Sequence, residues 1–185
     1  MIAFVDRSDI LFWAAQVLGT IICIISTLSY FTKKKTSYLY AQFSVNALYS
    51  VQYFMLGSIA GGISNIVSLS KYVYFAYNAK REKENPKASI FIFCGLSVIL
   101  GIPAIDGWHT FIPIITSVLF TFAIWQDSAV VLRIIVMLCN VLWIIFNFKV
   151  QAYVSMVYSI VELVVALVTT ILIIRKGKKD ELQNN

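Results

Sequence analysis

The chain is built from long apolar runs, each close to the length of a membrane-spanning helix, with short polar segments between them. A helix needs roughly 20 mostly apolar residues to cross the hydrocarbon core of a bilayer. The sequence of 185 residues is 59% hydrophobic and only 13% charged. A soluble domain carries about 25% charged residues, and this much apolar surface does not fit inside one small core. The pattern predicts an all-α integral membrane protein.

We predict seven transmembrane helices that together form one transmembrane domain, residues 1–185. The fourth and fifth are short, and the polar turn Asp106–His109 separates them. A basic tail is expected over residues 175–185. The predicted spans are Ile10–Phe31, Tyr38–Leu56, Ile59–Asn78, Ala88–Ile105, Thr110–Trp125, Ala129–Phe148 and Ala152–Ile174.

Lysine and arginine predict the orientation, because cytoplasmic connections are enriched in both residues. With seven spans, the connections that carry most of the basic residues fall on one side of the membrane. The N-terminus is then expected outside and the C-terminus in the cytoplasm, with only Arg7 and Lys149 on the outer side. The same placement explains the net charge of +6 without a nucleic-acid partner. The inner basic residues are Lys33, Lys34, Lys35, Lys80, Arg81, Lys83, Lys87, Arg133, Arg175, Lys176, Lys178 and Lys179.

An internal repeat appears when the chain is shifted by 94 residues. The second and third spans then align with the sixth and seventh without a gap, so that Asn46 falls on Asn140, Tyr49 on Trp143 and Phe54 on Phe148. This predicts two parallel three-helix repeats, residues 10–78 and 110–174, joined by a linker helix at 88–105. Parallel repeats occur in some transporters, whose substrate sites lie at the repeat interface near the midplane.

Polar residues recur at helical spacing within the apolar spans, and two interpretations of them stay open. Small polar residues hold helices together in lipid. Alternatively, they line a water-filled cavity in which Tyr49 and Trp143 stack on a flat ligand from two sides. The candidate substrate-binding or cavity-lining residues are Glu162, Lys71, Asn65, Ser68, Asn46, Asn140, Tyr49, Trp143 and Ser159.

Glu162 is an acidic residue deep inside a span, about 15 Å from the outer end of its helix at 1.5 Å per residue. An ionisable side chain at that depth is costly and indicates a functional site. Lys71 is its candidate partner. Three roles remain open: a structural ion pair with Lys71, a charge that faces the ligand, and a proton-coupling site.

The sequence does not favour an enzyme or a cofactor-binding protein. Its three cysteines lie in separate apolar runs, and its one histidine, His109, is in a loop. No spacing of metal ligands, paired intramembrane carboxylates or glycine-rich phosphate loop is present. We therefore expect no catalytic residue, no metal and no cofactor.

Nearly the whole chain resembles the bacterial inner-membrane YgjV family, and its 3+1+3 plan resembles the SWEET and PQ-loop transporter superfamily. Asn65 matches the asparagine of the third SWEET helix, while Ser159 stands at the equivalent site of the second triad. The resemblance implies a multi-pass protein of the inner membrane. The matching features are Gly19, Lys33–Lys35, Gly57–Ile66, Gly107-Trp108, Ile112–Ile115, Trp125-Gln126, Leu142–Asn147 and Glu162.

Two functions are expected from these observations. The first is a transporter that moves a small polar organic solute by alternating access at the repeat interface. The second is a non-transporting scaffold or assembly protein, fixed by a Glu162–Lys71 ion pair and packed dry between the repeats. A polar cavity of a few hundred cubic ångströms, typical of small-molecule sites, would argue against the scaffold. Both leave room for a homo-oligomer in the lipid bilayer.

Overall fold

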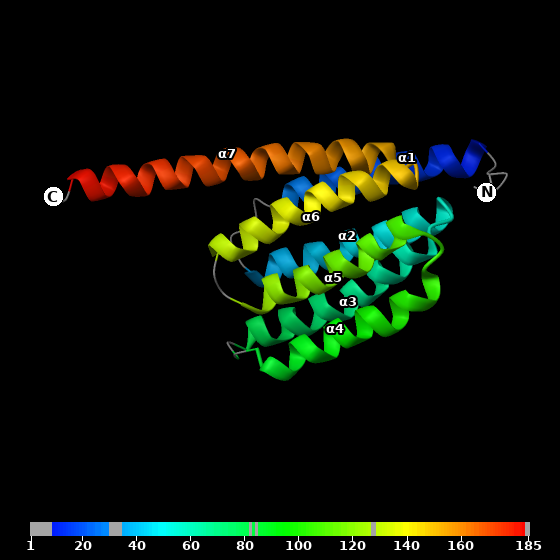
Figure 1. Cartoon of the computed structure of the whole chain (residues 1–185), viewed down its shortest axis with the longest axis horizontal. Helices are drawn as coiled ribbons and strands as arrows, with labels where there is room; N and C mark the ends of the chain where they lie inside the picture. Colours follow the sequence, from blue (N-terminus) through cyan, green and yellow to red (C-terminus); the bar gives the residue numbers. More distant parts are fainter. Residues whose placement is uncertain (1–8, 30–34, 82, 84, 127–128, 184–185) are drawn as a thin grey trace.

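A computed structural model describes residues 9–29, 35–81, 83, 85–126 and 129–183. Within these residues all regular secondary structure is helical (Figure 1). Two short 3-10 helices, Ile102–Ala104 and Trp108–Thr110, lie in the connection before α5. The α-helices are α1 (Asp9–Ser29), α2 (Lys35–Met55), α3 (Ile59–Lys80), α4 (Lys87–Gly101), α5 (Phe111–Trp125), α6 (Ala129–Lys149) and α7 (Tyr153–Gln183).

Each predicted span overlaps one of these helices, and the ends of α4 and α7 differ most from the prediction. The α-helix α4 ends at Gly101 and becomes 3-10 helix, because Pro103 has no N–H to continue the α-helical hydrogen bonds. The last helix continues to Gln183, through most of the segment expected to be a tail. The predicted orientation also used Arg7, Lys33 and Lys34, which lie outside the described residues.

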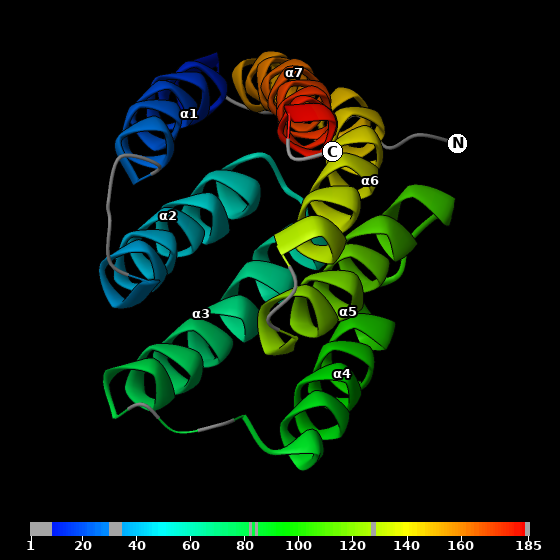
Figure 2. The ribbon, with the colours of Figure 1, turned by 90° about the vertical axis from the view of Figure 1, so that its left-hand side faces the viewer.

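Six of the helices form a closed ring of contacts. Around the ring, α1 packs on α2, α2 on α3, α3 on α5, α5 on α6, α6 on α7, and α7 on α1. Helix α4 packs against α3 and α5 at the far side of the bundle from α1 and α7 (Figure 2). Every ring helix therefore has one face toward its neighbours, and the outer faces carry many exposed apolar side chains that suit lipid.

Length and apolar composition alone mark three described segments as able to cross a membrane, Asp9–Ser29, Lys87–Ala104 and Trp108–Trp125. Shorter apolar helices are found at Ile134–Lys149 and Tyr153–Val168. Helices α2 and α3 are less apolar because they carry buried polar side chains such as Gln52, Asn65 and Lys71. These groups face protein, which explains how a helix inside the bundle tolerates them.

The loops α2–α3 and α6–α7 have the same backbone structure, 94 residues apart. Gly57 has a positive φ of 73° and Gln151 a positive φ of 60°. The N–H of Ser58 bonds the carbonyl of Tyr53, and the N–H of Ala152 bonds that of Asn147, at 2.8 and 2.9 Å. Both helices thus end in a Schellman motif. Three neighbouring N–H to carbonyl bonds of the first loop also recur 94 residues later. In the first loop they run from Leu56 to Gln52, from Gly57 to Phe54 and from Gly62 to Ser58. Their equivalents in the second loop run from Val150 to Phe146, from Gln151 to Phe148 and from Met156 to Ala152.

Candidate functional site

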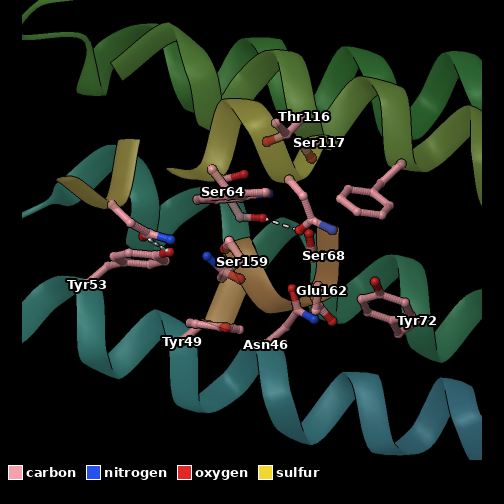
Figure 3. A pocket seen from close by; sticks show the side chains of 15 residues that line it. Asn46, Tyr49, Tyr53, Ser64, Ser68, Tyr72, Thr116, Ser117, Ser159 and Glu162 are labelled. Carbon is pink, nitrogen blue, oxygen red and sulfur yellow. Dashed lines mark hydrogen bonds between the residues drawn. The ribbon is translucent and has the colours of Figure 1, made fainter. Parts of the chain in front are cut away.

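A polar cavity of about 110 Å³ lies among five helices of the ring (Figure 3). That volume holds about three or four water molecules, or one solute of similar size. Amides, hydroxyls, aromatic rings and one carboxylate form its wall. The lining residues are Asn46, Tyr49 and Tyr53 of α2, Ser64, Asn65, Ser68 and Tyr72 of α3, Thr116, Ser117 and Phe120 of α5, Asn140, Trp143 and Asn147 of α6, and Ser159 and Glu162 of α7.

The cavity brings together eight of the nine residues singled out from the sequence. They are separated by more than a hundred positions in the chain and come from α2, α3, α6 and α7. Lys71 is the ninth, and it is not part of the wall. Whether the cavity binds a solute stays a prediction.

The sequence argument left out seven lining residues: Tyr53, Ser64, Tyr72, Thr116, Ser117, Phe120 and Asn147. Most of them belong to the polar stripes at helical spacing, so the signal for them was present. Asn147, for example, lies two helical turns after Asn140. Phe120 is an ordinary apolar residue in an apolar helix, and nothing in the sequence marks it.

Lys71 is 1% exposed and is bonded to α5. Its Nζ donates to the carbonyl oxygen of Ser117 at 3.0 Å and to the hydroxyl of Ser117 at 2.8 Å. The hydroxyls of Ser97 and Ser117 are also 2.8 Å apart, which joins α4 to the same cluster. The expected pairing of Lys71 with Glu162 is therefore not the arrangement seen here. One turn along α3 from Ser68, the lysine points to the α3–α4–α5 junction and not to α7.

The expected stacking of a ligand between Tyr49 and Trp143 also differs from the structure. The ring of Tyr53 lies between them, 5.8 Å from each ring centre and tilted by 13° and 12°. Phe146 meets Tyr53 edge-on at 5.4 Å. The protein fills this slot with its own aromatic ring, because the three rings stack in the offset geometry that aromatic pairs favour.

The Tyr53 ring is fixed on both sides. Its hydroxyl donates a hydrogen bond of 2.8 Å to Oδ1 of Asn147 on α6. A Cβ added at Gly61 of α3 would come within 2.8 Å of the ring and within 3.0 Å of Phe146. Glycine at this position lets α3 approach closely enough for the stack to form. The stack lies at the end of the cavity nearest the α2–α3 loop.

Two glutamines connect α1 to the neighbouring helices close to this end. Gln52, fully buried, donates to the carbonyl of Ala15 at 2.9 Å and accepts from the hydroxyl of Ser155 at 3.0 Å. Gln16 donates to the carbonyl of Gln151 at 2.8 Å and accepts from the N–H of Val154 at 3.2 Å. Each side chain donates one N–H and accepts with its oxygen, so α1, α2 and α7 are joined by specific hydrogen bonds and not by packing alone.

The described residues contain no cluster of three or more histidine, cysteine or acidic side chains that could hold a metal. The arrangement is that of a helical membrane protein with a small, polar, partly enclosed cavity inside a ring of helices.

The family model Imp-YgjV, described as a bacterial inner membrane protein, matches residues 13–177. The chain belongs to this family and is a multi-pass protein of the bacterial inner membrane. Comparison with curated proteins and with solved structures finds no significant match.

Proposed function

We propose that the protein is a carrier that moves a small polar solute across the inner membrane through the cavity described above. The observation that carries the proposal is the composition of the cavity wall. It places asparagines, serines and the carboxylate of Glu162 within an otherwise apolar bundle. Polar and ionisable groups inside a membrane are costly and mark substrate or ion pathways. Binding of a polar solute in place of water would explain why these polar side chains are present inside the bundle.

The ring of contacts supports an alternating-access mechanism. In our proposal α1–α3 and α5–α7 are two parallel triads, and α4 is the linker outside them. In this arrangement the contact between α3 and α5 is equivalent to the contact between α7 and α1. Both contacts are present. The matching backbone structure of the loops at Gly57 and Gln151 also fits two equivalent triads. Rocking of one triad against the other would expose the cavity to each side in turn.

In this conformation we propose that the aromatic stack closes the outer end. With the N-terminus outside, the α2–α3 loop lies at the outer surface, and Tyr53 is close to that loop in the chain. The volume of about 110 Å³ is below the few hundred cubic ångströms that would by itself argue against a scaffold, and in our proposal it belongs to a closed state of the carrier. Separation of Tyr53 from Asn147 would enlarge the cavity on the outer side.

The scaffold interpretation requires a dry interface locked by the Glu162–Lys71 pair. It is less well supported, because Lys71 is bonded to Ser117 and because thirteen of the fifteen wall residues carry a hydroxyl, amide or carboxylate group. A dry interface would favour apolar side chains there, since each buried polar group costs free energy unless it is bonded.

Solute flux through reconstituted vesicles tests the proposal. Purified protein is reconstituted in lipid vesicles, which are shrunk by an osmotic step with each of a panel of small neutral solutes, and re-swelling is followed by light scattering. Charged solutes are followed by uptake of labelled compound. We expect at least one solute to enter faster than into protein-free vesicles, and Glu162→Gln to change its rate.

Asp106→Asn is the matched control, because it removes a carboxylate that is 76% exposed and lies outside the cavity. It should leave the flux unchanged. If Glu162→Gln and Trp143→Ala both fold and leave the flux of a transported solute unaltered, this cavity is not the pathway. If no solute of the panel crosses faster than in protein-free vesicles, the carrier function is wrong.

A further inference from the structure

Asn140 differs from Asn46 and Asn65 in the cavity wall, because its amide donor has no partner. Its side chain is 4% exposed, and its Nδ2 makes no hydrogen bond with any described residue. Nδ2 of Asn46 and Nδ2 of Asn65 each donate to the backbone carbonyl four residues earlier, at 2.8 Å. Asn140 stands four residues after Val136 in α6, yet its Nδ2 does not use that carbonyl. A buried amide donor of this kind indicates a position where a ligand or a water supplies the acceptor.

The α6 face of the wall carries a second amide that can still donate. Asn147 lines the cavity two helical turns after Asn140. Its Oδ1 accepts from the hydroxyl of Tyr53, and its N–H groups form no hydrogen bond within the described part of the chain. A half-turn of the Asn140 amide about its Cβ–Cγ bond exchanges Nδ2 with Oδ1 and breaks no hydrogen bond of Nδ2. Either edge of that amide can therefore face a solute, and α6 offers donors from two residues.

Hydroxyl groups of α3, α5 and α7 supply acceptors in the same wall (Figure 3). A hydroxyl oxygen can still accept a hydrogen bond after its own proton is used. Four wall hydroxyls donate to backbone carbonyls over 2.9 to 3.1 Å, and they belong to Ser64, Ser68, Thr116 and Ser159. A ligand in the cavity therefore meets amide donors on α6 and hydroxyl acceptors on three other helices. A solute that both accepts and donates hydrogen bonds can pair with both sets.

The charges near the cavity favour an uncharged solute. The fifteen wall residues include neither lysine nor arginine. The ammonium of Lys71 is outside the wall and bonds both the carbonyl and the hydroxyl oxygen of Ser117. An anion in the cavity would have no cation in the wall to offset its desolvation, and an ionised Glu162 would repel it. A cation whose polar groups are all N–H donors would leave the donor of Asn140 unpaired, which is costly in a buried site.

On the basis of the proposed carrier function, we propose that the solute is a small uncharged molecule of the primary amide or urea class. Its carbonyl oxygen accepts from the amide of Asn140, and its N–H groups donate to hydroxyl oxygens of the wall. A primary amide holds a carbonyl acceptor and two N–H donors in one compact group. This density of hydrogen-bonding groups suits a cavity of about 110 Å³, which has room for only a few non-hydrogen atoms.

Three probes of nearly the same size and shape separate charge from hydrogen bonding. Acetamide is uncharged and both donates and accepts, acetate is an anion that only accepts, and acetamidinium is a cation that only donates. Binding to the purified full-length protein is measured by thermal shift and calorimetry at constant ionic strength, up to about 100 mM, because ligands of so few atoms bind weakly. We expect acetamide and urea to bind, and acetate and acetamidinium to bind at least about tenfold more weakly, since each leaves buried groups unpaired.

Asn140→Leu tests the residue assigned to the carbonyl oxygen. It removes the unpartnered donor, so we expect the ligand-free protein to be at least as stable as wild type and to bind acetamide at least about fivefold more weakly. Asn85→Leu is the matched control, because it removes a half-buried amide outside the cavity wall and should leave acetamide binding unchanged. Acetamide binding that is unaltered in Asn140→Leu overturns the assignment to Asn140.

The remaining outcomes separate the solute class from the carrier function. Tighter binding of acetate or acetamidinium than of acetamide overturns the uncharged class, and this comparison uses only the wild-type protein. Tighter binding of glycerol, an uncharged alcohol, than of acetamide and urea overturns the amide class. Binding of urea or acetamide without faster entry of either into vesicles keeps the class and rejects the carrier. Flux of another solute without binding of either amide keeps the carrier and rejects the class. If no probe binds, the class is wrong.

Discussion

The hydroxyl of Tyr53 donates a hydrogen bond of 2.8 Å to Oδ1 of Asn147, the residue 94 positions later. In the proposed arrangement of two triads these residues hold equivalent positions, because the loops that follow α2 and α6 align at the same shift. Residues related by a two-fold axis touch only where they lie close to that axis. In that arrangement the bond between Tyr53 and Asn147 would lie close to the axis that relates α2 to α6.

Tyr53→Phe removes this bond and leaves the buried amide of Asn147 without its donor. We expect a loss of about 1–3 kcal/mol of stability, the cost of an unsatisfied buried group. Equilibrium unfolding by a denaturing detergent measures it. In the double variant Tyr53→Phe with Asn147→Leu, the loss should be smaller than the sum of the single losses. Tyr40→Phe is the control, since Tyr40 is half exposed, and additive effects at Tyr53 and Asn147 would contradict the prediction.

Lys71 allows a test that separates its charge from its volume. Lys71→Met keeps a long side chain and removes the buried ammonium, while the hydroxyl of Ser117 still has Ser97 as partner. We expect Lys71→Met to lie within about 1 kcal/mol of wild type, because replacing a buried ion by an apolar residue is often neutral. Lys71→Ala should cost about 2–5 kcal/mol through the cavity that it leaves. A large loss in both variants would show that the ammonium itself holds α3 to α5.

Most of the helices and most of the wall can be predicted from this sequence, because both follow from local periodicity. Apolar runs of about 20 residues give α1 to α7, and polar residues at helical spacing give Asn46, Asn140 and Glu162. The partner of Lys71 and the insertion of Tyr53 between Tyr49 and Trp143 could not be predicted. Both depend on how neighbouring helices are rotated and how closely they approach, which a single helix does not encode.

The α2–α3 and α6–α7 loops share one backbone structure, but they carry different residues at the position of positive φ. Glycine adopts this conformation freely at Gly57, whereas a side chain at Gln151 opposes it. Gly57→Ala should destabilise the protein by about 1–2 kcal/mol. Gln151→Gly should be neutral or stabilising by up to about 1 kcal/mol, since the relief of the left-handed conformation is partly offset by a freer unfolded chain. The same unfolding assay measures both, and a stabilising Gly57→Ala would mean that the first loop is not under this constraint.

The aromatic stack predicts which face of the membrane reaches the cavity. A single cysteine at Ser68, in a background whose native Cys23, Cys94 and Cys139 are replaced by serine or alanine, reports access to the wall. With Tyr53 in place, a membrane-impermeant cationic thiol reagent added outside should label it slowly. Tyr53→Ala removes the middle ring, and we expect labelling from outside to become at least several-fold faster. The cysteine-free chain corrects for background, and rapid outside labelling with Tyr53 intact would place the closed end on the other side.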